Sequence, residues 1–132
     1  MIPREGPLWA ILAAVGGGAA LGAWVRWGLS YWLNPRLAHL PLGTLAANIA
    51  GGYLIGLAVG WFAASPELSP LLRLLLVTGF LGGLTTFSTF SAENVALMQQ
   101  GDWSAALIHI VAHLGGSLLA TVAGLMTWRW LA

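Results

Sequence analysis

Residues 78–91 read TGFLGGLTTFSTFS, and this stretch interrupts an otherwise apolar span. A double glycine and a cluster of hydroxyl residues replace the leucines that precede it, so a regular helix is not expected across it. Irregular backbone at membrane depth survives only where it is buried in protein or lines a wet cavity, and its freed carbonyls then suit a small hard cation. A flexible glycine packing site is the alternative, but a broken helix is favoured because polar groups exposed to lipid are costly.

The stretch lies in the third of four apolar windows. Of the 132 residues, 58% are hydrophobic and 7% charged, and the mean hydropathy is +0.83, as in membrane proteins. About 20 apolar residues cross the hydrocarbon core, and the polar breaks leave four expected spans: 8–33, 43–64, 71–98 and 103–130. The sequence predicts one all-α transmembrane domain over residues 1–132, with its third helix broken at mid-membrane. The protein is expected to cross a cell membrane several times.

Composition disfavours several function classes. The net charge is +1 and lysine is absent, so no basic field attracts nucleic acid. Without cysteine, the sequence offers no disulfide framework or thiolate site. No nucleophile and base pair, metal cluster or phosphate loop stands out, so the chain is not expected to be an enzyme. The first span is too long for a secretory signal and carries Trp24 and Trp27, which favours a retained helix.

The arginines barely orient the chain. Four spans place Arg4, Arg73 and Arg129 on one side of the membrane, and Arg26 and Arg36 on the other. Orientation depends on a clear excess of Lys and Arg on the cytoplasmic side. This near balance permits insertion in both orientations, and hence an antiparallel homodimer.

Two phenylalanines follow the break. Phe87 and Phe90 are three residues apart and share a helix face, with Ser88 and Thr89 between them. Such a pair usually packs in a core or faces lipid. Rings turned edge-on to a pathway would present electropositive edges that favour a small anion and offer no carbonyl to a cation.

The second span carries an amide. Asn48 is followed at four-residue steps by Gly52, Gly56 and Gly60, a spacing that lets helices pack closely. The amide needs a hydrogen-bond partner, and it either joins helices or donates to an anion in a pore. The sequence leaves both roles open.

The fourth span carries a polar track. His109, His113, Ser117 and Thr121 follow one another at four-residue steps. Their N–H and O–H groups suit the replacement of an anion's hydration shell, or they bond carbonyls of a neighbouring helix; the run of four favours the track. The histidine spacing also suits a metal, but a zinc site is disfavoured because Glu93 is the one membrane carboxylate nearby.

Arg26 and Glu93 are the ionisable residues deepest in the expected spans. A charge at the centre of the bilayer costs about 3 kcal/mol, so both are functional candidates unless they reach the interface. Proton exchange at Glu93 would make the chain a proton-coupled small four-helix exporter, the main alternative function. A scaffold whose glycines and hydroxyls only pack helices is a third possibility.

Residues 79–93, GFLGGLTTFSTFSAE, closely resemble the signature of the Fluc fluoride channels, also called CrcB proteins. The resemblance extends over essentially the whole chain. It is supported by GAWVRW at 22–27, by Gly43-Thr44 with Asn48 and Gly51-Gly52, and by Gly116-Ser117.

This resemblance implies a passive, fluoride-selective channel that exports fluoride across a bacterial inner membrane. It further implies an antiparallel dual-topology homodimer with two pores and a buried structural sodium ion. The implied fluoride pore residues are Asn48, Phe87, Phe90, Ser88, Thr89, Ser117 and Thr121.

The resemblance also implies roles at the break and around it. The backbone carbonyls of Gly82 and Thr85, two from each subunit, match the sodium ligands. Arg26 matches an arginine near the vestibule, and Glu93 matches the carboxylate that follows the signature. His109 departs from the pattern, since some members have tyrosine there, so the roles of His109 and His113 are left open.

Overall fold

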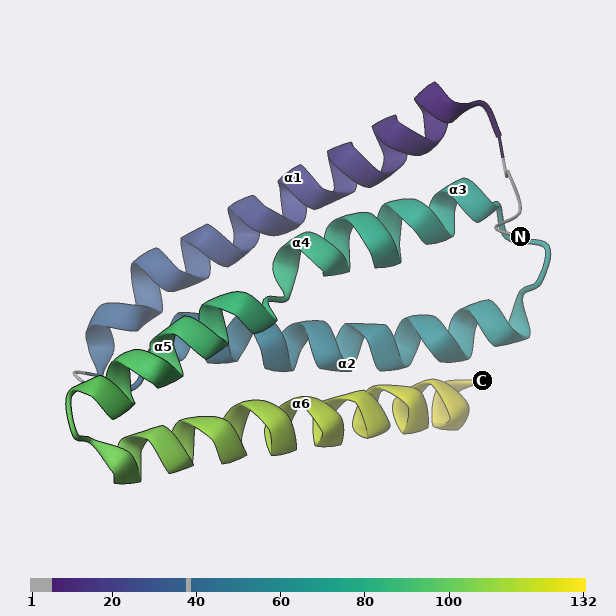
Figure 1. Ribbon diagram of the computed structural model, residues 1–132. Coiled ribbons are helices and arrows are strands. Elements are labelled where there is room, and N and C mark those ends of the chain that lie inside the picture. Colours follow the sequence, from purple (N-terminus) through teal and green to yellow (C-terminus); the bar gives the residue numbers. More distant parts are fainter. Residues whose placement is uncertain (1–5, 38) are drawn as a thin grey trace.

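The computed structural model describes residues 6–37 and 39–132, and its described part is helical (Figure 1). Arg4, counted above in the charge balance, lies outside these ranges. Four helical segments are long and apolar enough to cross a membrane: Leu8–Arg36, Leu42–Ala64, Pro70–Gln99 and Trp103–Leu131. The third is interrupted, so the prediction of four membrane-length helices with a broken third is confirmed.

The uninterrupted helices are α1 (Leu8–Leu33), which continues into the 3-10 turn η1 (Asn34–Arg36), α2 (Leu42–Ala64) and α6 (Trp103–Leu131). The third segment consists of α3 (Pro70–Arg73), the π-helical run η2 (Leu74–Leu81), α4 (Gly82–Leu84) and α5 (Phe87–Gln99). Prolines stand at helix starts, where the missing N–H has no intrahelical partner to lose.

The helices pack in two layers that α5 connects (Figure 1). α1 lies along η2 and α4, while α2 packs most extensively against α6. Beyond the break, α5 leaves α1 and packs on α6. The break therefore lies where the third segment passes from one layer to the other.

Glycines set both close helix contacts. A Cβ at Gly56 of α2 would lie 2.1 Å from the Thr121 carbonyl oxygen of α6. A Cβ at Gly22 of α1 would lie 2.0 Å from the Phe80 carbonyl oxygen of η2. Both distances are shorter than any carbon–oxygen contact, so these backbones touch only because the side chain is absent. Among the glycines of the second span, Gly56 thus has a packing role.

Gly22→Ala is expected to destabilise the fold by about 1–3 kcal/mol or more, because its methyl group meets fixed backbone and forces α1 away from η2. Thermal unfolding in detergent measures this effect. Gly28→Ala in the same helix is the control, since a Cβ there meets nothing within 4 Å. Equal melting temperatures for the two variants would contradict the close contact.

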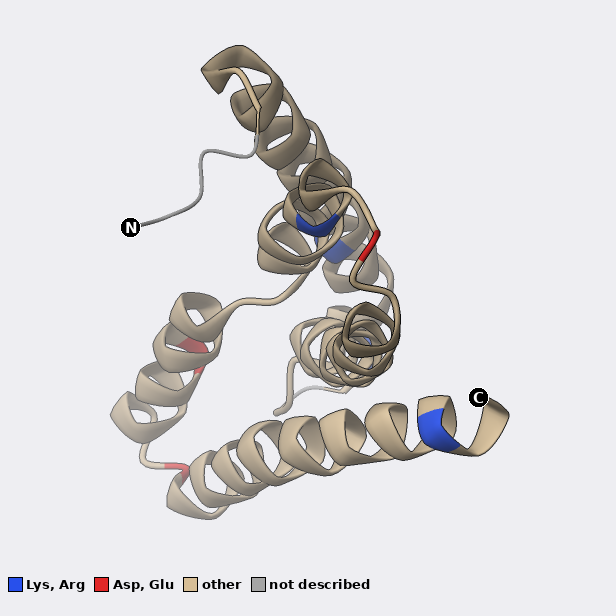
Figure 2. Cartoon of the chain, turned by 90° about the vertical axis from the view of Figure 1, so that its right-hand side faces the viewer, with Lys and Arg blue, Asp and Glu red and all other residues tan. Residues whose placement is uncertain are grey.

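Charged residues are few and scattered over several elements (Figure 2). Arg26 in α1 and Glu93 in α5 lie within long helices, whereas Glu67 and Asp102 lie in connections between helices. Arg26 and Glu93 are therefore the charges whose partners matter most for the site.

Candidate functional site

The helix is broken at two threonines. The backbone is extended at both residues: φ is −87° and ψ is 153° at Thr85, and φ is −153° and ψ is 120° at Thr86. α4 ends just before them and α5 begins just after them. The Thr86 hydroxyl then accepts the Thr89 N–H at 3.1 Å, which caps the new helix.

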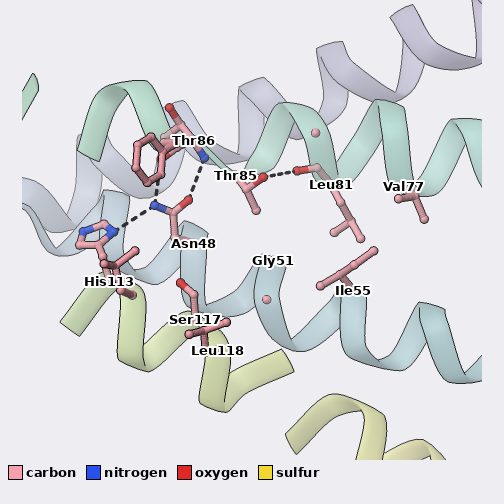
Figure 3. A pocket seen from close by; sticks show the side chains of 14 residues that line it. Asn48, Gly51, Ile55, Val77, Leu81, Thr85, Thr86, His113, Ser117 and Leu118 are labelled. Carbon is pink, nitrogen blue, oxygen red and sulfur yellow. Dashed lines mark hydrogen bonds between the residues drawn. The ribbon is translucent and has the colours of Figure 1, made fainter. Parts of the chain in front are cut away.

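Asn48 holds the break in place (Figure 3). Its Oδ1 accepts the Thr86 N–H at 2.8 Å, and its Nδ2 donates to the Thr86 carbonyl at 3.0 Å. The same Nδ2 lies 3.0 Å from Nδ1 of His113. Both amide hydrogens are thus engaged, so Asn48 joins α2, α6 and the break. Its place in a fluoride pore stays a prediction.

Arg26 supports the break from the other side. Its Nε donates to the Gly83 carbonyl oxygen at 3.0 Å. That oxygen lies in the last turn before the break, where intrahelical donors are lost. The arginine predicted for a vestibule therefore lies against the broken helix in this chain.

Two carbonyl oxygens at the break lack their usual donors. The Thr85 N–H bonds Leu81 and the Thr86 N–H bonds Asn48, so neither bonds the Gly82 carbonyl. Within residues 6–37 and 39–132, no hydrogen bond reaches the Thr85 carbonyl. The Thr85 hydroxyl instead bonds Leu81 O at 2.8 Å. Backbone oxygens left free in this way are ligands that a hard cation prefers.

The two phenylalanines differ in their surroundings. Their ring centroids are 5.4 Å apart at an interplanar angle of 60°, an edge-to-face contact. Phe87 is 70% exposed, whereas Phe90 is 6% exposed and packs on His109 and His113. Phe90 is therefore held by the chain itself, and Phe87 lies on a face that a partner is free to cover.

Hydroxyl groups gather near the start of α5. The Thr86 hydroxyl donates to Thr89 Oγ1 at 3.1 Å and lies 3.3 Å from Ser88 Oγ. On α6 the Thr121 hydroxyl donates to the Ser117 carbonyl of its own helix at 2.9 Å. The structure thus groups Ser88 and Thr89 at the break, while Thr121 lies further along α6.

A cavity of about 510 Å³ opens beside the break. Its lining includes Asn48, Thr85, Thr86, Phe87, His113 and Ser117 (Figure 3). Residues expected at the pore from α2, α5 and α6 thus meet around one space. Phe90, Ser88, Thr89 and Thr121 are not among the lining residues.

A polar network surrounds Glu93. Its Oε1 accepts the Thr44 hydroxyl at 2.5 Å, and its Oε2 lies 3.2 Å from His109 Nε2. Asn94, which the sequence analysis missed, donates to Ala106 O at 2.9 Å and lies 3.2 Å from His109 Nδ1. An amide in an apolar span was the signal that could have identified Asn94.

Comparisons with known proteins identify the family of the chain. The family model described as CrcB-like protein, Camphor Resistance (CrcB), matches residues 13–125. A relative from Cupriavidus pinatubonensis, named fluoride-specific ion channel FluC, is 62% identical over 119 residues, covering 90% of this chain and 94% of the relative. A protein of that name from Chromobacterium violaceum is 56% identical over 124 residues, or 94% and 98% of the two chains.

A third relative, from Ralstonia pickettii and with the same name, is 61% identical over 116 residues, or 88% of this chain and 92% of its own. The resemblance seen in residues 79–93 is thus confirmed. Since the family model spans most of the chain and these relatives match it over nearly their full length, the chain belongs to the CrcB family.

Proposed function

We propose that this chain forms a fluoride-selective passive channel that exports fluoride across a bacterial inner membrane. The observation that carries the proposal is the broken third segment, where Asn48 holds extended backbone open beside a cavity and the phenylalanine pair. The names of the relatives specify fluoride.

Fluoride suits this site physically. It is small and strongly hydrated, so it enters a narrow pathway only where donors replace its water. Two kinds of group near the break can do this. They are the hydroxyls of Ser88, Thr89 and Ser117 and the ring edges of Phe87 and Phe90. A passive leak suffices for export, because the membrane potential drives anions out of a cell with a negative interior.

A second copy is proposed to complete the pathway. In one chain the Thr85 carbonyl has no donor among residues 6–37 and 39–132, the cavity beside it is open, and Phe87 is exposed. Such groups facing lipid are costly, so a partner that covers them is favoured. The near balance of arginines permits insertion in both orientations, which supports an antiparallel homodimer.

A structural sodium ion is proposed between the two copies. The Gly82 and Thr85 carbonyls would hold it, two from each subunit, since both lack their usual hydrogen-bond donors. Bound sodium would supply the positive charge that four converging carbonyl dipoles need.

Removal of sodium is expected to lower the melting temperature. Protein purified in N-methyl-D-glucamine chloride should gain about 3 kcal/mol when sodium is added at roughly 100 times its dissociation constant. Potassium chloride is the control, because the larger ion fits four close carbonyls less well. A melting temperature that is the same in all three salts would contradict the sodium site.

Fluoride efflux from liposomes tests the channel itself. Vesicles loaded with potassium fluoride, with valinomycin to carry the compensating charge, are expected to release fluoride rapidly and retain chloride. The proton-coupled exporter would instead need a pH gradient and would stop in Glu93→Gln. An absence of release from folded, assembled protein would contradict the channel.

A further inference from the structure

Two buried histidines lie in contact beside the phenylalanine pair. His109 and His113 are 2% and 3% exposed, and their ring centroids are 4.5 Å apart. Both rings pack on Phe90, at 5.0 and 4.7 Å between centroids. Each ring presents one nitrogen to an asparagine, and these contacts determine where each ring carries its proton.

Asn48 fixes the tautomer of His113. The Thr86 N–H donates to Oδ1 of Asn48, and Nδ2 donates to the Thr86 carbonyl, so the amide cannot be turned over without breaking both bonds. Nδ2 therefore also faces His113 Nδ1, at 3.0 Å (Figure 3). Because an amide nitrogen only donates, His113 Nδ1 accepts and the proton lies on Nε2.

Asn94 acts on His109 in the same way. Its Nδ2 donates to Ala106 O and faces His109 Nδ1, so His109 also carries its proton on Nε2. That N–H donates to Glu93 Oε2 at 3.2 Å. The corresponding group of His113 has no partner among residues 6–37 and 39–132, although it is buried. A buried donor without an acceptor is costly, so the site favours a ligand that accepts a hydrogen bond.

These tautomers disfavour a metal ion. Ligand atoms of Glu93, His109 and His113 lie within 4.8 Å of one another, close enough to suggest a metal site. A metal would need both Nε2 atoms unprotonated and both Nδ1 atoms donating. Each Nδ1 instead faces the NH2 group of an anchored asparagine.

We propose that the Nε2–H group of His113 binds the permeating fluoride ion. This inference rests on the proposed function and names a donor within it. Asn48 has both amide hydrogens engaged, so the donor that is left without a partner beside the break is the buried Nε2–H of His113, a residue that lines the cavity. A carboxylate oxygen of Glu93 lies within 4.8 Å of a ring nitrogen of His113. A carboxyl group so close weakens the binding of an anion, which suits a site that ions must also leave.

Nitrogen NMR of protein labelled with 15N-histidine tests this assignment directly. Long-range 1H–15N spectra report which ring nitrogen of His113 is protonated. Titration with sodium fluoride is expected to shift the Nε2–H resonance of His113 in a saturable way, whereas sodium chloride should not. His109 is an internal control, since its N–H is bound to Glu93. A proton on Nδ1, or no shift specific to fluoride, would overturn the proposal.

Two substitutions test the same group by flux. His113→Phe keeps a ring on Phe90 but removes the N–H, and it should reduce fluoride efflux roughly 10- to 100-fold, as for one lost hydrogen bond to a charged group. His113→Gln keeps an N–H donor and should retain more flux. His39→Gln is the matched control, because His39 is exposed near Asp102. Full flux in His113→Phe would refute the role of the N–H.

The two proposals fail in distinguishable ways. If wild-type protein conducts fluoride but His113 shows no fluoride-specific shift, the assignment of His113 is wrong and the channel stands. If wild-type protein neither conducts fluoride nor shows the shift, the proposed function is wrong. The titration uses wild-type protein, so it decides the assignment even where a substitution at this buried position prevents folding.

Discussion

Phe90→Ile is expected to reduce fluoride efflux at least roughly a hundredfold, equivalent to about 2.7 kcal/mol in the barrier. The Phe90 ring packs on His109, His113 and Phe87, so contacts within the chain determine its position. Isoleucine fills much of the same space but has no electropositive edge to offer an anion. Efflux from liposomes loaded with potassium fluoride measures the loss, and size-exclusion chromatography checks assembly.

Phe62→Ile is the matched control for this substitution. Phe62 stacks on Trp61 near the end of α2 and lies beside Arg73, away from the break. Its replacement should leave fluoride efflux near the wild-type rate. Wild-type efflux in assembled Phe90→Ile would show that the ring only packs, as the scaffold interpretation requires.

Asn48→Leu is expected to cause the largest loss of stability. Leucine has nearly the same size but leaves the N–H and carbonyl of Thr86 and Nδ1 of His113 without their partner. Each polar group left without a partner away from water costs about 1–3 kcal/mol, so the loss of all three bonds is expected to cost about 3 kcal/mol or more. The extended backbone should collapse, and folded, conducting protein should be lost.

The melting temperature and the assembled fraction in detergent measure this effect. Gln99→Leu provides the control, because it makes the same kind of change on an exposed residue at the end of α5. Similar melting temperatures for Asn48→Leu and Gln99→Leu would mean that Asn48 does not hold the break.

The sequence was sufficient for the spans and the break because both depend on local composition. Apolar length defines a crossing, and Gly82-Gly83 followed by Thr85-Thr86 is poorly suited to a helix. The π-helical run over Leu74–Leu81 was not foreseen, since its leucine-rich sequence is equally suited to an α-helix.

The partners of the polar groups could not be predicted. Thr44 bonds Glu93 from 49 residues away, and Arg26 bonds Gly83 from 57 residues away. Such pairs depend on how helices pack, which hydropathy and spacing do not specify. The same limit applies to Asn48, because only the positions of Thr86 and His113 show where its two amide hydrogens go.

α1 begins and α6 ends at the same end of the bundle (Figure 1). An even number of crossings returns the chain to the side on which it started. A direct genetic fusion of two copies would therefore give both the same orientation, and the proposed antiparallel pair could not form within one polypeptide. A tandem protein that keeps this architecture needs an odd number of additional crossings as its linker. On the proposed antiparallel pairing, tandem proteins with and without one inserted transmembrane helix should thus differ in whether a single polypeptide conducts fluoride in liposomes.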